Sequence, residues 1–204
     1  MALALPRLAL SSVAGWLCTA LACAYPAVAQ TTTAVSTPDS AAPHDSLGLR
    51  EATTWLTDSL PRVASFTLHD RLNGQPVADA ARTLSDVHID GCTVSWIVGT
   101  VSPGVSSRVK ITANLTAVDP ALVTVVRRDT IRAPAGRLIH DPPVWEMTAP
   151  TRDGSSPVSF ENTTNNVHLT LPTLDLFVGG RDDAWRTAAA IASLTRACQQ
   201  AAPH

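Results

Sequence analysis

Short runs of alternating apolar and polar residues fill the middle of this chain, and they restrict its possible folds more than any other feature. In residues 87–98, Val94, Trp96 and Val98 fall on one side of the run, and residues 109–115 alternate in the same way. A period of two indicates strands with one buried face. The runs are short and are joined by turn residues, so crossover helices between parallel strands have no room. We therefore expect an antiparallel β-sheet of about seven strands, rolled up or forming a partly open barrel.

Segments with helical periodicity precede and follow the predicted strands in the sequence. Apolar residues recur at helical spacing in residues 46–60, and Pro61 is expected to end this helix. A second helix is expected after Gly179-Gly180, with Asp182 as its cap, and runs as far as Pro203. Further strands are expected at residues 64–68, 122–128, 144–148, 158–161, 167–171 and 174–178. The predicted fold class is α+β, with an N-terminal helix and a C-terminal helix that caps the antiparallel sheet.

The start of the chain has the pattern of a secretory leader. Arg7 is followed by an uncharged stretch at residues 8–24 and by a triplet of small residues at 27–29. This order predicts a signal peptide over residues 1–29 with cleavage after Ala29. An uncleaved membrane anchor is the alternative, because the uncharged stretch approaches the length that spans a bilayer. Pro26 and the triplet argue against the anchor.

The leader also predicts where the protein is found. Lipid attachment at Cys23 is disfavoured, because Ala20 stands where a larger aliphatic residue is usual. No later stretch is apolar and long enough to span a membrane, so we expect a secreted or periplasmic protein. Residues 30–45, rich in Thr, Ser, Pro and Ala, are expected to form a disordered spacer, and residues 46–202 a single α+β domain.

Cysteine usage agrees with an oxidising compartment. Cys18 and Cys23 lie in the predicted leader, which leaves Cys92 and Cys198. An isolated pair in such a compartment forms a disulfide more often than a metal site, because zinc needs two further ligands at a suitable spacing. Two buried free thiols are the alternative that the sequence leaves open. A Cys92–Cys198 bond would attach the C-terminal helix to the sheet.

The charge of the chain argues against one large class of partners. The formal net charge is -2 at pH 7, and charged residues make up 16% of the chain. A chain with this balance has no overall attraction for phosphate polymers. We therefore expect no nucleic-acid partner, and a protein or a small molecule in the cell envelope remains as the candidate. No motif predicts a cofactor.

Three residues are candidates for metal binding. His88 and Asp90 are two residues apart on a predicted strand and so project from the same face, and His140 is the third candidate. Alternation alone also explains His88 and Asp90 as an exposed polar face opposite Val87 and Ile89. We favour the exposed face, and no catalytic residue is predicted.

Two dipeptides on predicted strands are candidates for ligand binding. Trp145-Glu146 is the dipeptide most similar to a sugar site, and Arg127-Arg128 is a local basic pair that could contact an acidic partner. For both dipeptides, a strand with one wet face or a solvated sheet edge is the simpler explanation.

The order of the predicted elements resembles the pleckstrin-homology-like architecture. The likeness lies in about seven short antiparallel strands, a last strand at residues 174–178 and a closing helix with an early tryptophan, Trp185. The resemblance implies a sheet closed by that helix. Lipid-binding members of this family present lysine and arginine in the first hairpin, where this chain has Arg71, Asn73 and Gly74. Phosphoinositide binding is therefore not carried over.

These observations lead to one favoured function and two alternatives. We favour an exported, non-catalytic binding or accessory module with a pocket between the sheet and the C-terminal helix. The first alternative is a small secreted hydrolase or metal-dependent enzyme, which requires His88, Asp90 and His140 to meet in one cleft. The second is a structural envelope protein without a small ligand, which would have no enclosed pocket and one exposed apolar patch.

Overall fold

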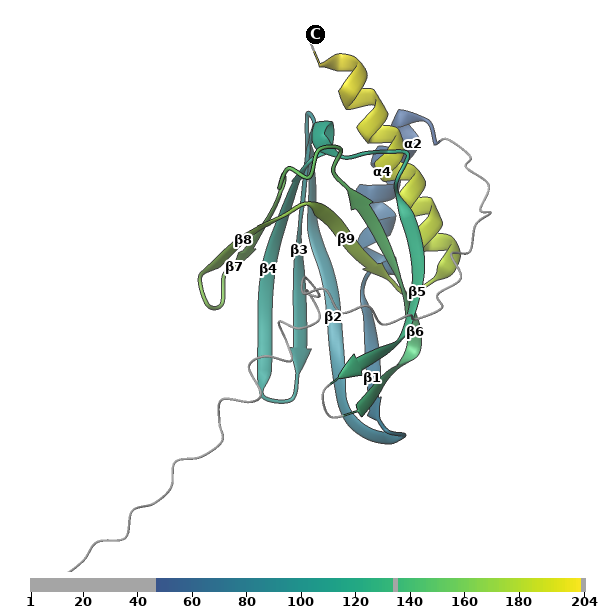
Figure 1. Cartoon of the computed structure of the whole chain (residues 1–204), viewed down its shortest axis with the longest axis vertical. Coiled ribbons are helices and arrows are strands. Elements are labelled where there is room, and N and C mark those ends of the chain that lie inside the picture. Colours follow the sequence, from purple (N-terminus) through teal and green to yellow (C-terminus); the bar gives the residue numbers. More distant parts are fainter. Residues whose placement is uncertain (1–46, 134–135, 203–204) are drawn as a thin grey trace, which may run out of the picture. The chain divides into compact units, whose positions relative to one another are not determined.

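The structure of the chain, a computed structural model, describes residues 47–133 and 136–202 (Figure 1). Within these ranges, residues 77, 78, 129–133, 136–138 and 140 are described by their backbone and not by their side chains. The predicted leader (1–29) and spacer (30–45) lie outside the described residues. All the described residues belong to one compact unit.

One helical segment, nine strands and a long C-terminal helix follow one another along the described chain. The first helical segment consists of α2 (Leu49–Thr54), the π-helical turn η1 (Trp55–Ser59) and α3 (Leu60–Val63). The strands are β1 (Phe66–Leu72), β2 (Gln75–Asp90), β3 (Thr93–Ser102), β4 (Val105–Asn114), β5 (Thr124–Ala133), β6 (Gly136–Pro150), β7 (Val158–Asn162), β8 (Val167–Leu171) and β9 (Thr173–Val178). A short 3-10 turn, η2 (Leu115–Ala117), follows β4, and α4 (Arg181–Ala201) follows β9.

The first helical segment forms around a stripe of apolar side chains. Ala52, Leu56 and Leu60 recur at helical spacing and are fully buried. The expected end at Pro61 is wrong, because the helix continues to Val63. Proline lacks the backbone donor that a helix interior needs, but here it falls in the first turn of α3, directly after the π-helical turn, where that donor is not required.

The nine strands form one antiparallel sheet, which is open rather than closed into a barrel. The strand order is β5-β6-β1-β2-β3-β4-β7-β8, and β9 pairs with β6. This confirms the predicted α+β class, in which the strands of an antiparallel sheet follow an N-terminal helix and precede a C-terminal helix along the chain. The sheet has nine strands rather than about seven.

Part of the difference comes from β2, which has 16 residues. The alternating pattern predicts one strand over residues 87–98, which the structure divides at Gly91 into the end of β2 and the start of β3, and it misses residues 75–85. The register with β3 is irregular between Ser85 and His88, and Asp86 has a positive φ of 54°. Such a bulge shifts the phase of the alternation by one residue, so the two halves of β2 do not form one periodic pattern in the sequence.

The sheet branches at β6. One edge of β6 pairs with β5, and the other pairs with β1 up to Asp141 and with β9 from Trp145 onward. Pro142 and Pro143 lie between the two pairings, and proline cannot donate a hydrogen bond to a ladder. β8 leads into β9 through Pro172 alone, so the chain passes directly from one end of the strand order back to β6.

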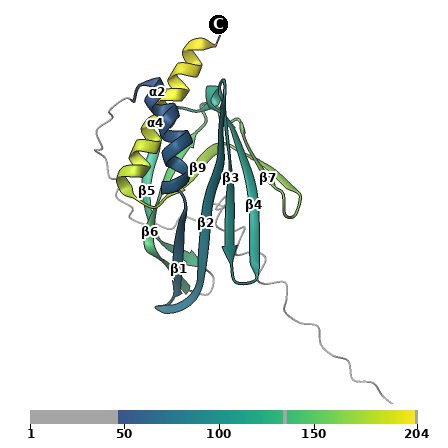
Figure 2. The same cartoon turned by 180° about the vertical axis from the view of Figure 1, so that it is seen from behind.

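The helix α4 packs against the first helical segment and against the sheet, as Figure 2 shows from behind. Its buried side consists mostly of small residues: Ala184, Thr187, Ala188, Ala190, Ile191, Ala192, Leu194, Thr195 and Cys198. Small side chains allow the neighbouring helix to approach closely. The indole N–H of Trp55 donates a hydrogen bond to the Thr187 hydroxyl at 3.1 Å, and Arg186 pairs with Glu51 at 2.8 Å.

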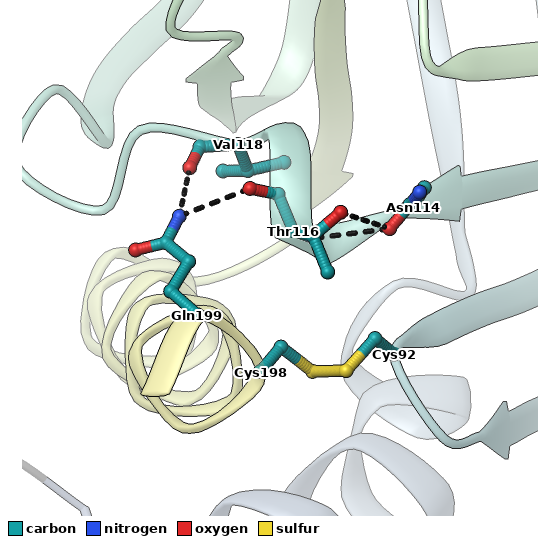
Figure 3. The surroundings of a disulfide bond; sticks show 6 residues. All are labelled: Cys92, Asn114, Thr116, Val118, Cys198 and Gln199. Carbon is teal, nitrogen blue, oxygen red and sulfur yellow. Dashed lines mark hydrogen bonds between the residues drawn. A yellow bond between two sulfur atoms is a disulfide. The ribbon is translucent and has the colours of Figure 1, made fainter. Parts of the chain in front are cut away.

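A disulfide between Cys92 and Cys198 joins the β2–β3 turn to the last turns of α4 (Figure 3). This confirms the predicted pairing. The neighbouring Gln199 donates through Nε2 to the carbonyl oxygens of Thr116 at 3.2 Å and Val118 at 2.8 Å. The C-terminal end of α4 is therefore attached to the β2–β3 turn by a covalent bond, and to η2 and the following Val118 by two hydrogen bonds from the adjacent residue.

We predict that the disulfide makes a large contribution to the stability of the folded protein. The two cysteines are 106 residues apart in sequence. A bond that closes a loop of this length restricts the unfolded chain and contributes about 4–5 kcal/mol. We expect the variant Cys92→Ala/Cys198→Ala to lose about that much free energy of unfolding, measured by urea denaturation. Reductant should destabilise the wild type and leave the variant unchanged. Equal stability of the oxidised wild type and the variant would contradict this expectation.

Candidate functional site

The three metal candidates lie far apart on the sheet. His88 and Asp90 are exposed near one end of β2, where they pair with Ser95 and Thr93 of β3. The backbone of His140 pairs with Asp70 of β1, which pairs in turn with Ala78 of β2. Ten residues of strand separate position 78 from position 88, which is about 30 Å at the usual rise per residue. The structure therefore does not bring His140 to the other two residues.

Among the residues that the structure describes, no three His, Cys, Asp or Glu side chains group as a metal site. His69 does have acidic neighbours, since its Nδ1 lies 2.8 Å from Oδ1 of Asp79. Both side chains are more than half exposed, so water screens this pair. The pair is best explained as a contact between adjacent strands.

The four binding candidates do come together, on the adjacent strands β5 and β6. Arg127 lies directly opposite Trp145, and Nε of Arg128 donates to Oε2 of Glu146 at 2.6 Å. Consecutive strand residues point to opposite faces, so the four form two separate pairs, one on each face of the sheet. Glu146 is mostly buried, with 14% of its side chain exposed, whereas Arg128 is 47% exposed.

Each pair has a structural explanation. The Arg181 guanidinium at the start of α4 lies 5.9 Å from the centre of the Trp145 ring, so Trp145 joins the helix to β6. The Arg128–Glu146 ion pair compensates a carboxylate that has little access to water. Trp145 therefore links β6 to α4, and Arg128 links β5 to Glu146 of β6.

The Arg128–Glu146 pair gives a stability prediction. Arg128→Met leaves the mostly buried Glu146 carboxylate without its cation, and we expect it to lower the free energy of unfolding by about 1–3 kcal/mol. The double variant Arg128→Met/Glu146→Gln should regain part of this loss, because no unpaired charge remains. Chemical denaturation of the two single variants and the double variant measures the coupling. Losses that simply add would show that the two side chains do not interact.

The core side of the sheet continues beyond the helices as a half-buried surface. Figures 1 and 2 show that one end of β1, β2, β3 and β4 extends past α2 and α4. Six partly exposed residues define this surface, which we call the half-buried face: Phe66, Leu68, Arg82, Val109, Phe160 and Leu169. Arg82 and Val109 each lie two residues from a buried core residue of the same strand, so they point to the core side.

The register of the strands confirms that these residues share one side. Phe66 lies directly opposite Arg82, and Phe160 lies directly opposite Leu169. Residues opposite one another in an antiparallel pair project from the same face. The residues between them, such as Thr67 on β1, are exposed on the other side of the sheet. The half-buried face is therefore distinct from the solvent-exposed face of the same strands.

This face combines apolar surface with charge at one border. The Arg82 guanidinium lies 5.1 Å from the centre of the Phe177 ring, and Asp70 follows Leu68 on the same side of β1. Val109 and Phe160 also pack against the main core. Apolar walls with a few placed polar groups are the usual composition of a ligand site. The sequence already contains these residues, but the register that unites them is a property of the sheet.

The space between the sheet and α4 is filled by side chains. Trp96 from β3, Leu56 from the first helical segment and Ile191 from α4 are buried almost completely in one core. A shallow depression lies across β7 and β8, and four of its lining residues, Ser159, Glu161, His168 and Thr170, belong to the exposed face of these strands. Because the side chains between the sheet and α4 are buried in one core, we place the candidate binding surface on the half-buried face.

Comparison with known proteins finds no matching family model, no matching curated protein and no matching solved structure. The resemblance to the pleckstrin-homology-like architecture therefore stays a prediction. The helical segments within the described ranges include none that is long and apolar enough to cross a membrane.

Proposed function

We propose that this protein is an exported, non-catalytic binding module that holds an apolar ligand against the half-buried face. The observation that carries the proposal is the partial exposure of Phe66, Leu68 and Leu169 on the core side of the sheet. A ligand that removed these three side chains from water would gain the free energy of apolar burial.

The chemistry of the face favours an elongated ligand with an apolar body. The apolar residues extend across several strands, from β1 to β8, and Arg82 and Asp70 provide polar contacts beside them. A small number of polar groups beside a large apolar area can fix the orientation of a ligand, while the apolar area provides most of its affinity. If the protein is an accessory module, the same face would bind another protein instead of a small ligand.

Export is the second part of the proposal. The predicted leader supports it, and so does the Cys92–Cys198 disulfide, because such bonds persist in oxidising compartments. The catalytic alternative requires His88, Asp90 and His140 to meet in one cleft, and the strand register favours the binding module, because it separates the backbone of His140 from the other two residues.

A neighbouring pair of residues on β1 tests the proposed site. We expect the wild type to bind the uncharged dye N-phenylnaphthylamine with an increase in fluorescence. Leu68→Glu should weaken this binding by about tenfold or more, because the introduced carboxylate must lose water when the dye binds. Thr67→Glu adds the same charge on the opposite face of the same strand and should bind the dye like the wild type.

A second pair of variants, on β4, tests whether the loss of dye binding is caused only by a local change in β1. Val109→Gln should weaken dye binding, whereas Lys110→Gln, on the exposed face, should not. Thermal unfolding of each variant shows whether it remains folded. Absence of dye binding by the wild type would overturn the proposal and favour the structural envelope protein. Equal effects of Leu68→Glu and Thr67→Glu would place the dye elsewhere.

A further inference from the structure

The two strands that end the strand order differ in how they are protected against another strand. Exposed sheet edges attract further strands, and proteins usually protect them with charged residues, proline or bulges. β5 carries Arg127 and Arg128, and its register with β6 is irregular between Arg128 and Thr130. This end of the sheet therefore has two of the usual protections.

β8 has none of these protections. Its sequence, Val167-His168-Leu169-Thr170-Leu171, contains no Lys, Arg, Asp, Glu or Pro. Its register with β7 is regular over all five residues. Val167, Leu169 and Leu171 are half-buried on one face, and His168 and Thr170 are exposed on the other. Among the described residues, no strand pairs with the outer edge of β8.

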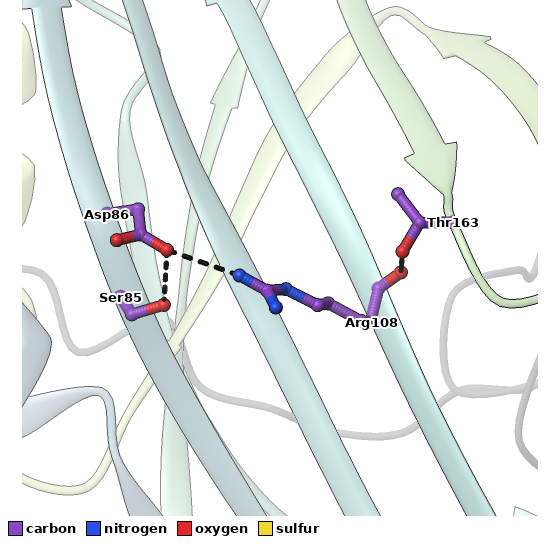
Figure 4. Close-up of polar contacts among 4 residues, drawn as sticks. All are labelled: Ser85, Asp86, Arg108 and Thr163. Carbon is purple, nitrogen blue, oxygen red and sulfur yellow. Dashed lines mark hydrogen bonds and ion pairs between the residues drawn. The ribbon is translucent and has the colours of Figure 1, made fainter.

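The β7–β8 hairpin is held firmly against β4. The Arg108 carbonyl accepts hydrogen bonds from the Thr163 amide at 3.0 Å and from the Thr163 hydroxyl at 3.1 Å, and the Arg108 amide donates to the Thr164 hydroxyl at 3.2 Å. Figure 4 shows the hydroxyl contact and, on the other side of Arg108, its guanidinium 3.5 Å from Asp86 of β2. These contacts fix the position of the turn, so the edge of β8 is a preformed template.

We propose that β8 pairs antiparallel with β8 of a second copy of this chain, around a two-fold axis at Leu169. In this register Leu169 meets its counterpart, Val167 meets Leu171, and His168 meets Thr170. Apolar residues then lie opposite apolar residues, and polar residues lie opposite polar ones. No two residues of like charge lie opposite each other. A strand that complements itself in this way fits the isologous contact of a symmetric dimer.

Other registers match less well. A two-fold axis at His168 would place the two imidazoles opposite each other. An axis at Thr170 would place Pro172, which lacks a donor, opposite His168. An axis at Val167 would bring Asn166, which has a positive φ of 56° in the turn, into the ladder. The axis at Leu169 is therefore the register that uses all five residues of β8.

The proposed pairing would join the two sheets into one. The row formed by Phe160 and Leu169 would continue into Leu169 and Phe160 of the second copy, so their exposed apolar area would be reduced. Strands of five residues form a small contact, and we expect a reversible dimer whose population rises with protein concentration. The pairing does not depend on the ligand proposed above, since it uses the backbone edge of β8.

Charge reversal at the two-fold axis tests the pairing. Sedimentation of the wild type should show the mass of two chains at high concentration. Leu169→Lys and Leu169→Glu should each sediment as single chains, because two like charges then face each other at the axis. An equimolar mixture of the two variants should recover the mass of two chains, which also shows that both remain folded. Val126→Lys is the matched control, because Val126 is also a half-buried residue of a strand that ends the strand order, β5. This variant should sediment like the wild type.

A cysteine at the axis provides a second readout. Opposite residues of an antiparallel pair lie close enough for a disulfide. Leu169→Cys should therefore form a covalent dimer on mild oxidation, and Val126→Cys should not. A wild type that sediments as a single chain at all concentrations, or a mixture of charge variants that fails to associate, would overturn the proposal. Dye binding by such a single chain would leave the proposed function standing.

Discussion

The packing of α4 against the sheet is the interaction on which the other features of this protein depend. α4 supplies small residues such as Ala184 and Ala188 to the core, and its two ends are attached differently. Cys198 is bonded to Cys92 at the C-terminal end, whereas Arg181 lies over the Trp145 ring at the N-terminal end. Because the helix is held at both ends, it covers a defined part of the core side and leaves the rest of that side to the half-buried face.

The branching of the sheet at β6 determines which surfaces remain for binding. Two prolines in β6 separate its pairing with β1 from its pairing with β9. As a result, β9 belongs to the half of the sheet that α4 covers, and the continuous path of strands ends at β8. The same topology therefore produces both the half-buried face and the open edge of β8, although one is a side-chain surface and the other a backbone surface.

The candidate residues show what a single sequence can predict about a site. Trp145, Glu146, Arg127 and Arg128 do lie together, because neighbouring strands of an antiparallel sheet pair residues that a period of two already identifies as strand residues. Arg128 pairs with Glu146 and Arg181 lies over the Trp145 ring, and the sequence had no signal for these contacts, since the burial of Glu146 depends on what covers it. His140 is a metal candidate because it stands beside an aspartate in the sequence, as His88 stands near Asp90, and strand order separates His140 from these two residues. The half-buried face was missed because its six residues come from five strands.

The sequence by itself determined much of the local structure: alternation predicts strands, helical spacing predicts the first helical segment and α4, and two cysteines remaining after the predicted leader favour one disulfide. These signals are local, or depend only on residue identity, so they can be detected without coordinates. Only the tertiary structure decided the full length of β2, whose bulge at Asp86 interrupts the period, and the branching at β6. It also decided which core-side residues the helices leave half exposed. These properties arise from contacts between segments far apart in the chain, where backbone register and packing select among arrangements that the local pattern allows equally.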